Sequence, residues 1–503
     1  MEAFLHPMVD PEAKQDIIAT GLPASPGGAT GQVVFSAEEA VEACAGGASV
    51  ILVRRETTPE DIHGMKVAQG ILTELGGMTS HAAVVARGMG VCAITGCGGI
   101  SVNYSEGAFT TDDGVTVKRR DVITLDGTSG EVMLGDIAKT EASSSDDFQL
   151  LLSWADKHRR LKVRANAETP TDAAKARELG AEGIGLCRTE HMFFEAERID
   201  VMRAMILAED EQERRKYLDK LFEFQHADIL ELFKVMDGLP VTIRLLDPPL
   251  HEFLPQSEED ITALAGRIGK SAETIREIAE GLAEVNPMLG FRGCRLSVVY
   301  PEITAMQVRA IITAAVDATE QGLKPFPEIM IPLVVNVREI RLVTDIIEAA
   351  IRDALKGKTA SIPYKIGTMM ETPRATLGAD RLADAVEFMS FGTNDLTQMT
   401  YGFSRDDVGK FLPAYLANKL VESDPFVSLD QRAVGRLMEL AVRESRARKP
   451  GIKYGICGEH GGDPRSIRFC HELGLDYVSC SPYRVPIARI AAAQANVGEE
   501  LPD

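Results

Sequence analysis

The pattern of apolar and polar positions changes near residue 140. Before it, apolar segments that predict short strands alternate with helical sequence and Gly/Asp turns; they are 32–35, 50–53, 91–94 and 122–125. Residues 1 to about 20 are interpreted as a polar lead-in helix or tail. The small, polar run 140–147 is typical of a linker. We therefore expect a mixed α/β domain over 1–139, a linker over 140–150 and a second domain over 151–503.

The second part of the chain repeats one pattern, in which a buried strand is followed by an amphipathic helix. The strand candidates are 162–165, 183–186, 241–246, 329–334, 365–369, 387–391, 453–457 and 476–480. Parallel strands that alternate with helices over such a length predict a (β/α)8 TIM barrel. One long amphipathic helix is expected over 201–236, and a helical insertion over 257–300.

Composition limits the classes of function. The 503 residues carry a net charge of −21, which argues against a nucleic-acid-binding or anionic-membrane surface, although arginines can still gather in a pocket for a phosphorylated substrate. No apolar run is long enough to span a bilayer, and no secretory signal is visible. The eight cysteines lack metal-site spacing and predict free thiols in a reducing cytoplasm.

The most informative stretch of the first domain is 76–90. Apolar residues lead into Gly76 and Gly77, then Thr79 and Ser80, then His81 at the predicted start of a helix. A helix N-terminus favours an anion such as phosphate, and a histidine there could carry phosphate covalently. The alternative is an ordinary helix cap with a surface histidine. Taken alone, the stretch favours that alternative.

Charged and reactive side chains follow several predicted barrel strands, where TIM-barrel active sites lie. Any one of these side chains alone suggests a salt bridge at the barrel rim, but their recurrence at several strand ends favours an active site. Glu371 and Asp395 suit Mg²⁺. Arginine side chains suit a phosphoryl group, and the candidates are Arg188, Arg244 and Arg292. Gly392-Thr393-Asn394 could present backbone N–H groups, and Cys457 is interpreted as an acid or base rather than as packing.

Six motifs together resemble the pyruvate, phosphate dikinase family of the phosphoenolpyruvate-utilising group. GGMTSHAAVVARGMG (76–90) resembles its phosphohistidine loop. Five further motifs resemble the phosphoenolpyruvate-binding barrel of this family: GIGLCRTEHMFF (183–194), NPMLGFRGCR (286–295), GTMMETPRA (367–375), SFGTNDLTQMTYG (390–402) and YGICGEHGGD (454–463). The resemblance covers essentially the whole chain.

The resemblance implies a role for each candidate. His81 would take phosphate on Nε2, and Cys457 would protonate the enolate of pyruvate, supported by Ser390 and Tyr477. Thr79 matches a threonine that is phosphorylated in some members of the family. The implied phosphate ligands are Arg188 and Arg244, with Arg292 nearby. Mg²⁺ would be held by Glu371 and Asp395, and the substrate site would be lined by Gly392, Thr393, Asn394 and Asp395. A homodimer formed through the barrel is also implied.

The chain departs from the family at its beginning. Only about 75 residues precede the histidine loop, so the ATP-grasp nucleotide-binding domain or chain is expected to be missing and ATP is not an expected substrate. The predicted activity is the reversible half-reaction between phosphoenolpyruvate and His81. The alternatives are a phosphoenolpyruvate synthase, the first enzyme of the sugar phosphotransferase system, or a non-catalytic phosphocarrier, although the last should have lost a residue such as Glu371 or Cys457.

Overall fold

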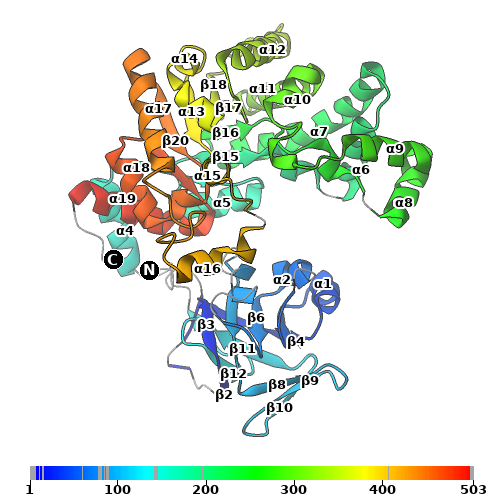
Figure 1. Ribbon diagram of the computed structural model, residues 1–503, viewed down its shortest axis with the longest axis vertical. Helices are drawn as coiled ribbons and strands as arrows, with labels where there is room; N and C mark the ends of the chain where they lie inside the picture. Colours follow the sequence, from blue (N-terminus) through cyan, green and yellow to red (C-terminus); the bar gives the residue numbers. More distant parts are fainter. Residues whose placement is uncertain are drawn as a thin grey trace. The chain divides into compact units, whose positions relative to one another are not determined.

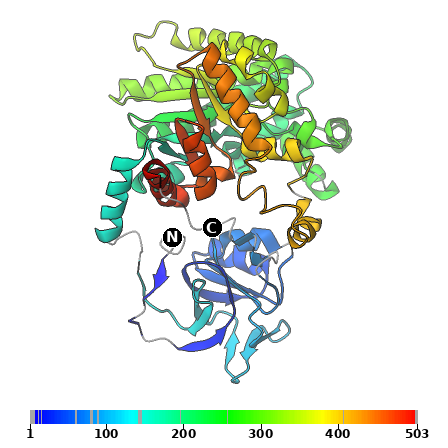
Figure 2. The same ribbon diagram turned by 60° about the vertical axis from the view of Figure 1, so that its left-hand side comes forward.

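The computed structural model describes residues 7–10, 12–13, 16–58, 61–77, 82–83, 85–86, 90–140, 146–194, 196–255, 257–405 and 407–498. The chain divides into two compact units, Met1–Leu151 and Leu152–Asp503 (Figures 1 and 2). The first is a small α/β sheet domain and the second a closed barrel of parallel strands. The predicted fold class is confirmed. No helix in the described part of the chain is long and apolar enough to cross a membrane.

The small unit is built on one eight-stranded sheet in the order β2-β12-β11-β4-β5-β6-β7-β3. Its strands are β2 (Ile17–Thr20), β3 (Leu22–Ser25), β4 (Gly28–Val34), β5 (Val50–Arg54), β6 (Gly70–Thr73), β7 (Cys92–Thr95), β11 (Val122–Asp126) and β12 (Glu131–Leu134). Strands β4 to β7 run parallel. A separate three-stranded sheet consists of β8 (Ile100–Asn103), β9 (Ala108–Thr111) and β10 (Thr116–Lys118).

The central strands of this sheet are buried on both faces. Along β5, Ile51 and Val53 belong to one apolar cluster, whereas Val50 and Leu52 belong to the cluster that contains residues of α1 (Ala37–Ala45) and α2 (Ile62–Val67). Successive side chains of a strand point to opposite faces, so a strand covered on both faces is apolar at every position. This explains why β5 has a continuous apolar sequence rather than an alternating one.

The predicted lead-in helix is not found among the described residues before 21. There, β1 (Met8–Val9) pairs with β13 (Lys139–Thr140), and β2 extends the main sheet beside β12. The β-branched pair Ile17-Ile18 suits a sheet edge better than a helix. At the other end, α4 (Asp146–His158) already begins within the expected linker. Regular structure therefore includes Thr140 and 146–150, and residues 141–145 lie outside the described residues.

The second unit is a closed barrel of eight parallel strands, as predicted. The strands are β14 (Lys162–Asn166), β15 (Ile184–Arg188), β16 (Pro240–Arg244), β17 (Phe326–Ile331), β18 (Lys365–Met370), β19 (Phe388–Phe391), β20 (Lys453–Ile456) and β21 (Tyr477–Cys480). Pairing of β14 with β21 closes the barrel. Strand β17 ends three residues before the predicted 334, because Pro332 has no N–H to donate and Leu333 has a positive φ of 55°.

Helices surround the barrel (Figure 1). The helices of this unit include α5 (Pro170–Glu178), α11 (Pro301–Glu320), α12 (Val337–Leu355), α13 (Pro373–Leu377), α14 (Ala379–Ala383), α15 (Thr393–Tyr401), α17 (Val434–Arg448), α18 (Pro464–Glu472) and α19 (Val485–Val497), and the long loop after α15 carries the short helix α16 (Leu412–Ala417). Several of these helices begin at a capping side chain. Asn336, for example, forms a capping box with Glu339 at the start of α12.

The insertions form a helical extension on one side of the barrel, drawn in green in Figure 1. It contains α6 (Ala196–Ile206), α7 (Glu211–Val235), α8 (Glu258–Ile268) and α9 (Ala272–Leu282), followed by α10 (Cys294–Val299). The predicted single helix 201–236 is wrong: Asp210 caps a new helix by accepting a hydrogen bond from the Glu213 N–H. The extension has its own apolar core, which includes Phe193, Leu221 and Leu264.

Candidate active site

A cavity of about 200 Å³ lies where five barrel strands end. Its lining is Leu186, Arg188, Arg244, Asp247, Arg292, Met369, Glu371, Gly392, Asn394, Asp395, Arg405, Cys457 and Gly458. The carboxyl ends of β15, β16, β18, β19 and β20 all contribute to it. All but one of the predicted substrate-binding residues lie in this lining. The exception is Thr393, which lies between two lining residues.

Two arginines end adjacent strands of the barrel. Arg188 is the last residue of β15 and pairs with Glu168 at 3.0 Å. Arg244 ends β16, is buried, and pairs with Glu190 and, at 2.8 Å, with Asp247. Burial acts to lower the pKa of Arg244, but the surrounding carboxylates outweigh it and raise that pKa. Both cations are therefore held in place before any substrate binds.

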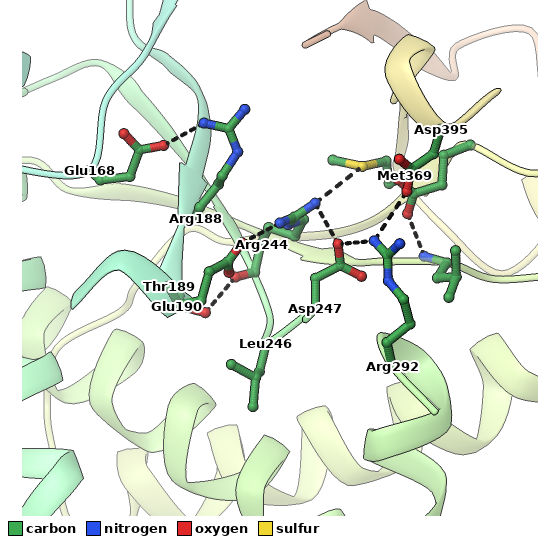
Figure 3. A network of polar contacts seen from close by, with 12 residues as sticks. Glu168, Arg188, Thr189, Glu190, Arg244, Leu246, Asp247, Arg292, Met369 and Asp395 are labelled. Atoms are coloured by element: carbon green, nitrogen blue, oxygen red, sulfur yellow. Dashed lines mark hydrogen bonds and ion pairs between the residues drawn. The ribbon is translucent and has the colours of Figure 1, made fainter. Parts of the chain in front are cut away.

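Asp247 joins two of the arginines, as Figure 3 shows. Its Oδ2 lies 2.8 Å from Arg244 Nη1 and 2.5 Å from Arg292 Nη2, and Arg292 also contacts Asp395 at 3.1 Å. Within the described residues, the Nε atoms of Arg244 and Arg292 and the Oδ1 atom of Asp247 have no hydrogen-bond partner. Buried N–H groups without a partner are costly and suit an anionic ligand with several oxygens.

Glu371 follows β18 and is 2% exposed. Its Oε1 accepts a hydrogen bond from the Leu333 N–H at 2.6 Å. Burial, together with repulsion from Asp247 and Asp395, raises the pKa of Glu371 to about 8. Burial also raises the pKa of Asp395, although Arg292 opposes it. The three carboxylates therefore repel one another, and a divalent cation would relieve that repulsion.

The site has the donor set for a hard cation rather than a closed metal site. Carboxylate oxygens of Glu371 and Asp395 are the ligand type that Mg²⁺ takes, usually with waters and substrate oxygens completing the shell. Across the described part of the chain, no three His, Cys, Asp or Glu side chains are arranged to hold a metal ion among themselves. Any ion at Glu371 and Asp395 would therefore have to take its other ligands from substrate or water.

The first turn of α15 forms another wall of the cavity. Gly392 precedes the helix, and Thr393, Asn394 and Asp395 are its first residues. A Cβ atom at Gly392 would lie 2.9 Å from Glu371 Oε2 and 2.8 Å from Met369 Sδ, so a side chain there would displace the carboxylate. The Glu459 N–H donates to Asn394 Oδ1 at 3.2 Å. These contacts place the helix start directly beside the carboxylates.

Cys457 follows β20 and lines the same cavity, although its residue is only 1% exposed. Burial raises the pKa of its thiol to about 11. At neutral pH the group is therefore a protonated thiol, which can donate a proton but is not a ready thiolate nucleophile.

Ser390 and Tyr477 lie in the barrel wall and do not line the cavity. Within the described residues, neither hydroxyl has a partner at hydrogen-bond geometry. Burial raises the pKa of Tyr477, and the Ser390 hydroxyl opposes the rise for both Tyr477 and Cys457. We interpret this as an electrostatic interaction rather than a formed hydrogen bond. Arg164 lies over the Tyr477 ring, 4.2 Å from its centroid.

His81 and Thr79 lie outside the described residues. The described residues on either side of this gap are Gly76 and Gly77 before it and Ala82 and Ala83 after it. Gly76 has a positive φ of 115°, as a turn after β6 requires, and Ala82, Ala83 and Ala86 are buried in the apolar core of the small unit.

Sequence reasoning missed some residues of the cavity. Asp247 is not among the predicted site residues, although it follows β16 closely and lies between two arginines of the site. Arg405 lies outside every motif, and only the folded chain brings it to the lining. Leu333 donates a backbone N–H to Glu371. Every residue except proline has such a group, so the residue type gives no sign of this contact.

Two family profiles match the chain. The profile described as "PEP-utilising enzyme, PEP-binding domain" matches residues 142–497, and "PEP-utilising enzyme, mobile domain" matches residues 46–130. Phosphoenolpyruvate is abbreviated PEP in these descriptions.

Three curated relatives are named pyruvate, phosphate dikinase. The protein of Rhizobium meliloti (strain 1021) is 56% identical over 100% of this chain and 56% of its own length. That of Clostridium symbiosum is 54% identical over 98% of this chain and 57% of its own length. The chloroplastic protein of Flaveria trinervia is 55% identical over 99% of this chain and 53% of its own length. The chain thus spans about half the length of these relatives. A profile that matches most of the chain, on a barrel whose strand ends meet at one charged cavity, shows that the chain belongs to the PEP-utilising enzymes.

Proposed function

We propose that this chain transfers the phosphoryl group of phosphoenolpyruvate reversibly to His81 and releases pyruvate. The observation that supports it most directly is the cavity in which arginines, carboxylates and a protonated thiol face one small volume. Phosphoenolpyruvate carries a phosphate, a carboxylate and a methylene carbon. The cavity offers a chemical partner for each of them.

In the forward direction, the Nε2 atom of His81 attacks phosphorus while the bond from phosphorus to the enol oxygen breaks. The electron pair of that bond stays on oxygen and forms the enolate of pyruvate. The Cys457 thiol then donates its proton to the methylene carbon, which becomes a methyl group, and the resulting thiolate recovers a proton from solvent. Arg188, Arg244 and Arg292 neutralise the phosphoryl oxygens during the transfer.

Mg²⁺ is proposed as the cofactor, held by Glu371 and Asp395, where it would supply positive charge to the developing enolate oxygen. The raised pKa values of Glu371 and Asp395, which are caused by burial and by repulsion between neighbouring carboxylates, support this assignment. Gly392, Thr393, Asn394 and Asp395 are proposed to line the substrate site. Ser390 and Tyr477 are proposed to support Cys457, and Thr79 remains the candidate for regulation.

We propose that the small unit is the phosphohistidine domain and that residues 140–150 join it to the barrel domain. The match of 46–130 to a "mobile domain" supports this role, since the histidine of such a domain has to travel between sites. We also propose that ATP chemistry resides outside these 503 residues, and that the barrel forms a homodimer. Eight free cysteines favour a reducing, cytoplasmic location.

The test is incubation with phosphorus-labelled phosphoenolpyruvate and Mg²⁺. The wild type should acquire acid-labile label and release one equivalent of pyruvate, and His81→Ala should acquire none. Label that persists in His81→Ala would exclude His81 as the carrier. ATP, phosphate and pyruvate together should yield no phosphoenolpyruvate; if they do, the proposal about ATP is wrong.

A further inference from the structure

His460 is a buried histidine that the proposed reaction does not use. It lies in the 3₁₀ turn Glu459–Gly462, three residues after Cys457, and is 0% exposed. Both of its ring nitrogens have partners. Nδ1 lies 2.7 Å from Thr393 Oγ1, and Nε2 lies 2.9 Å from the backbone oxygen of Pro425.

The direction of both hydrogen bonds follows from the chemistry of the partners. A carbonyl oxygen only accepts, so Nε2 of His460 carries the hydrogen and donates it to Pro425. Burial lowers the pKa of His460, which keeps the ring neutral. Nδ1 is then an acceptor, and the Thr393 hydroxyl must donate to it. Pro425 therefore selects the tautomer that can hold Thr393.

Thr393 is the first residue of α15, whose next two residues are Asn394 and Asp395. The turn that carries His460 contacts this helix start a second time, because the Glu459 N–H donates to Asn394 Oδ1. Gly458 permits the approach: a Cβ atom there would lie 2.2 Å from Thr393 Oγ1 and 3.1 Å from Asn394 Oδ1. Two hydrogen bonds and a glycine thus hold the helix start against the loop after β20.

We propose that His460 is a positioning residue: through Nδ1 it holds the Thr393 hydroxyl, and with it the first turn of α15, in the orientation that presents Asn394 and Asp395 to the cavity. This role rests on the proposed phosphoenolpyruvate chemistry for its effect on activity. The geometry of the His460 ring does not depend on that chemistry, so the two can be tested apart.

Two substitutions separate the two hydrogen bonds. In His460→Asn, the amide oxygen can occupy the place of Nδ1 and accept from Thr393, but nothing reaches Pro425. In His460→Gln, the amide nitrogen can occupy the place of Nε2 and donate to Pro425, but Thr393 loses its acceptor. His460→Ala removes both contacts, and Thr393→Val removes the hydroxyl with little change in shape.

The activity readout is the exchange of labelled pyruvate into phosphoenolpyruvate with Mg²⁺, which needs only the half-reaction. Losing the bond to Thr393 should raise KM for phosphoenolpyruvate by about tenfold in His460→Gln, His460→Ala and Thr393→Val, as the loss of one hydrogen bond predicts. His460→Asn, which keeps an acceptor for Thr393, should have a KM close to that of the wild type. The double variant that combines His460→Ala with Thr393→Val should have the same KM as either single variant, because both substitutions remove the same hydrogen bond.

A purely structural role would give a different outcome. The Asn and Gln variants would then lose activity in proportion to their loss of Tm, and the effects of His460→Ala and Thr393→Val would multiply. Either result would overturn the proposal.

A second readout does not need turnover. In full-length protein labelled with ¹⁵N-histidine, the resonances absent from His460→Asn identify His460. They should report a neutral ring with hydrogen on Nε2 at pH 7, and Thr393→Val should shift only Nδ1. A ring with hydrogen on Nδ1, or a charged ring, would overturn the inference. Wild-type protein without exchange activity would instead refute the proposed function and leave this measurement valid.

Discussion

The backbone N–H of Leu333 donates to the buried carboxylate of Glu371 at 2.6 Å. Leu333 holds a positive φ of 55°, a left-handed conformation that costs a residue with a Cβ atom about 1–2 kcal/mol. Its side chain is fully buried, which offsets that cost. A strained residue beside a functional carboxylate is a recurrent feature of active sites. Here the conformation at the end of β17 directs an N–H group towards Glu371.

Stability should depend on pH through Glu371. Its pKa is raised from 4.5 to about 8 by burial and by the neighbouring carboxylates, so between these values the folded state binds more protons than the unfolded state. The free energy of unfolding should therefore fall as pH rises from 4.5 to 8, by at most about 1.4 kcal/mol per pH unit. Calorimetry in metal-free buffer should find that the free energy of unfolding falls less steeply with pH in Glu371→Gln. Added Mg²⁺ should raise the Tm of the wild type more than that of Glu371→Gln. Equal slopes would contradict the assignment.

Gly458 should not tolerate a methyl group. The Cβ atom of Gly458→Ala would lie 2.2 Å from Thr393 Oγ1, and such overpacking typically costs about 1–3 kcal/mol. We expect a lower Tm and loss of pyruvate exchange. Gly409→Ala is the matched control, because a Cβ atom there meets nothing within 4 Å. Normal exchange in Gly458→Ala would show that the first turn of α15 adapts freely.

Cys457 should be required for proton transfer to carbon. Its raised pKa of about 11 keeps the thiol protonated across the usual assay range, and losing a positioned acid costs about 10²- to 10⁴-fold. Cys457→Ala should lower pyruvate exchange by that factor with little change in Tm. Cys480→Ala removes another buried thiol that does not line the cavity, and it should retain exchange. Full activity of Cys457→Ala would mean that the thiol is only packing.

Glu328 should support the barrel interior. It pairs with Arg164 at 2.7 Å and Lys453 at 2.8 Å and is fully buried. Burial acts to raise its pKa, but the two cations outweigh it and lower that pKa to about 2. This stabilisation is present above pH 4.5 and is lost as pH falls towards 2.

Glu328→Gln would leave two cations without their partner, at a cost of about 3–5 kcal/mol. Its effect on Tm should be largest at pH 7 and should decrease as pH falls from 4.5 towards 2. Glu348→Gln, at an exposed pair with Arg352, should change Tm little. A small effect of Glu328→Gln at pH 7 would show that water replaces the carboxylate.

Much of the fold and of the site could be predicted from the chain itself. Apolar periodicity depends on which faces of an element are buried, so it identified the eight barrel strands. It could not separate α6 from α7, because a helix break at the capping residue Asp210 leaves the amphipathic pattern nearly unchanged. Residue type and position at or near the end of a strand were enough to predict Arg188, Arg244, Glu371 and Cys457 as site residues, since parallel strands bring their carboxyl ends to one rim.

Only the tertiary structure decided the rest. Asp247 became part of the site because Arg244 and Arg292, far apart in sequence, both reach its carboxylate. The roles of Leu333 and His460 depend on a backbone N–H and on a ring tautomer selected by a distant carbonyl group. Such contacts depend on three-dimensional distance and direction. A linear pattern of residue types records what a side chain can do, whereas the folded chain determines which partner it meets.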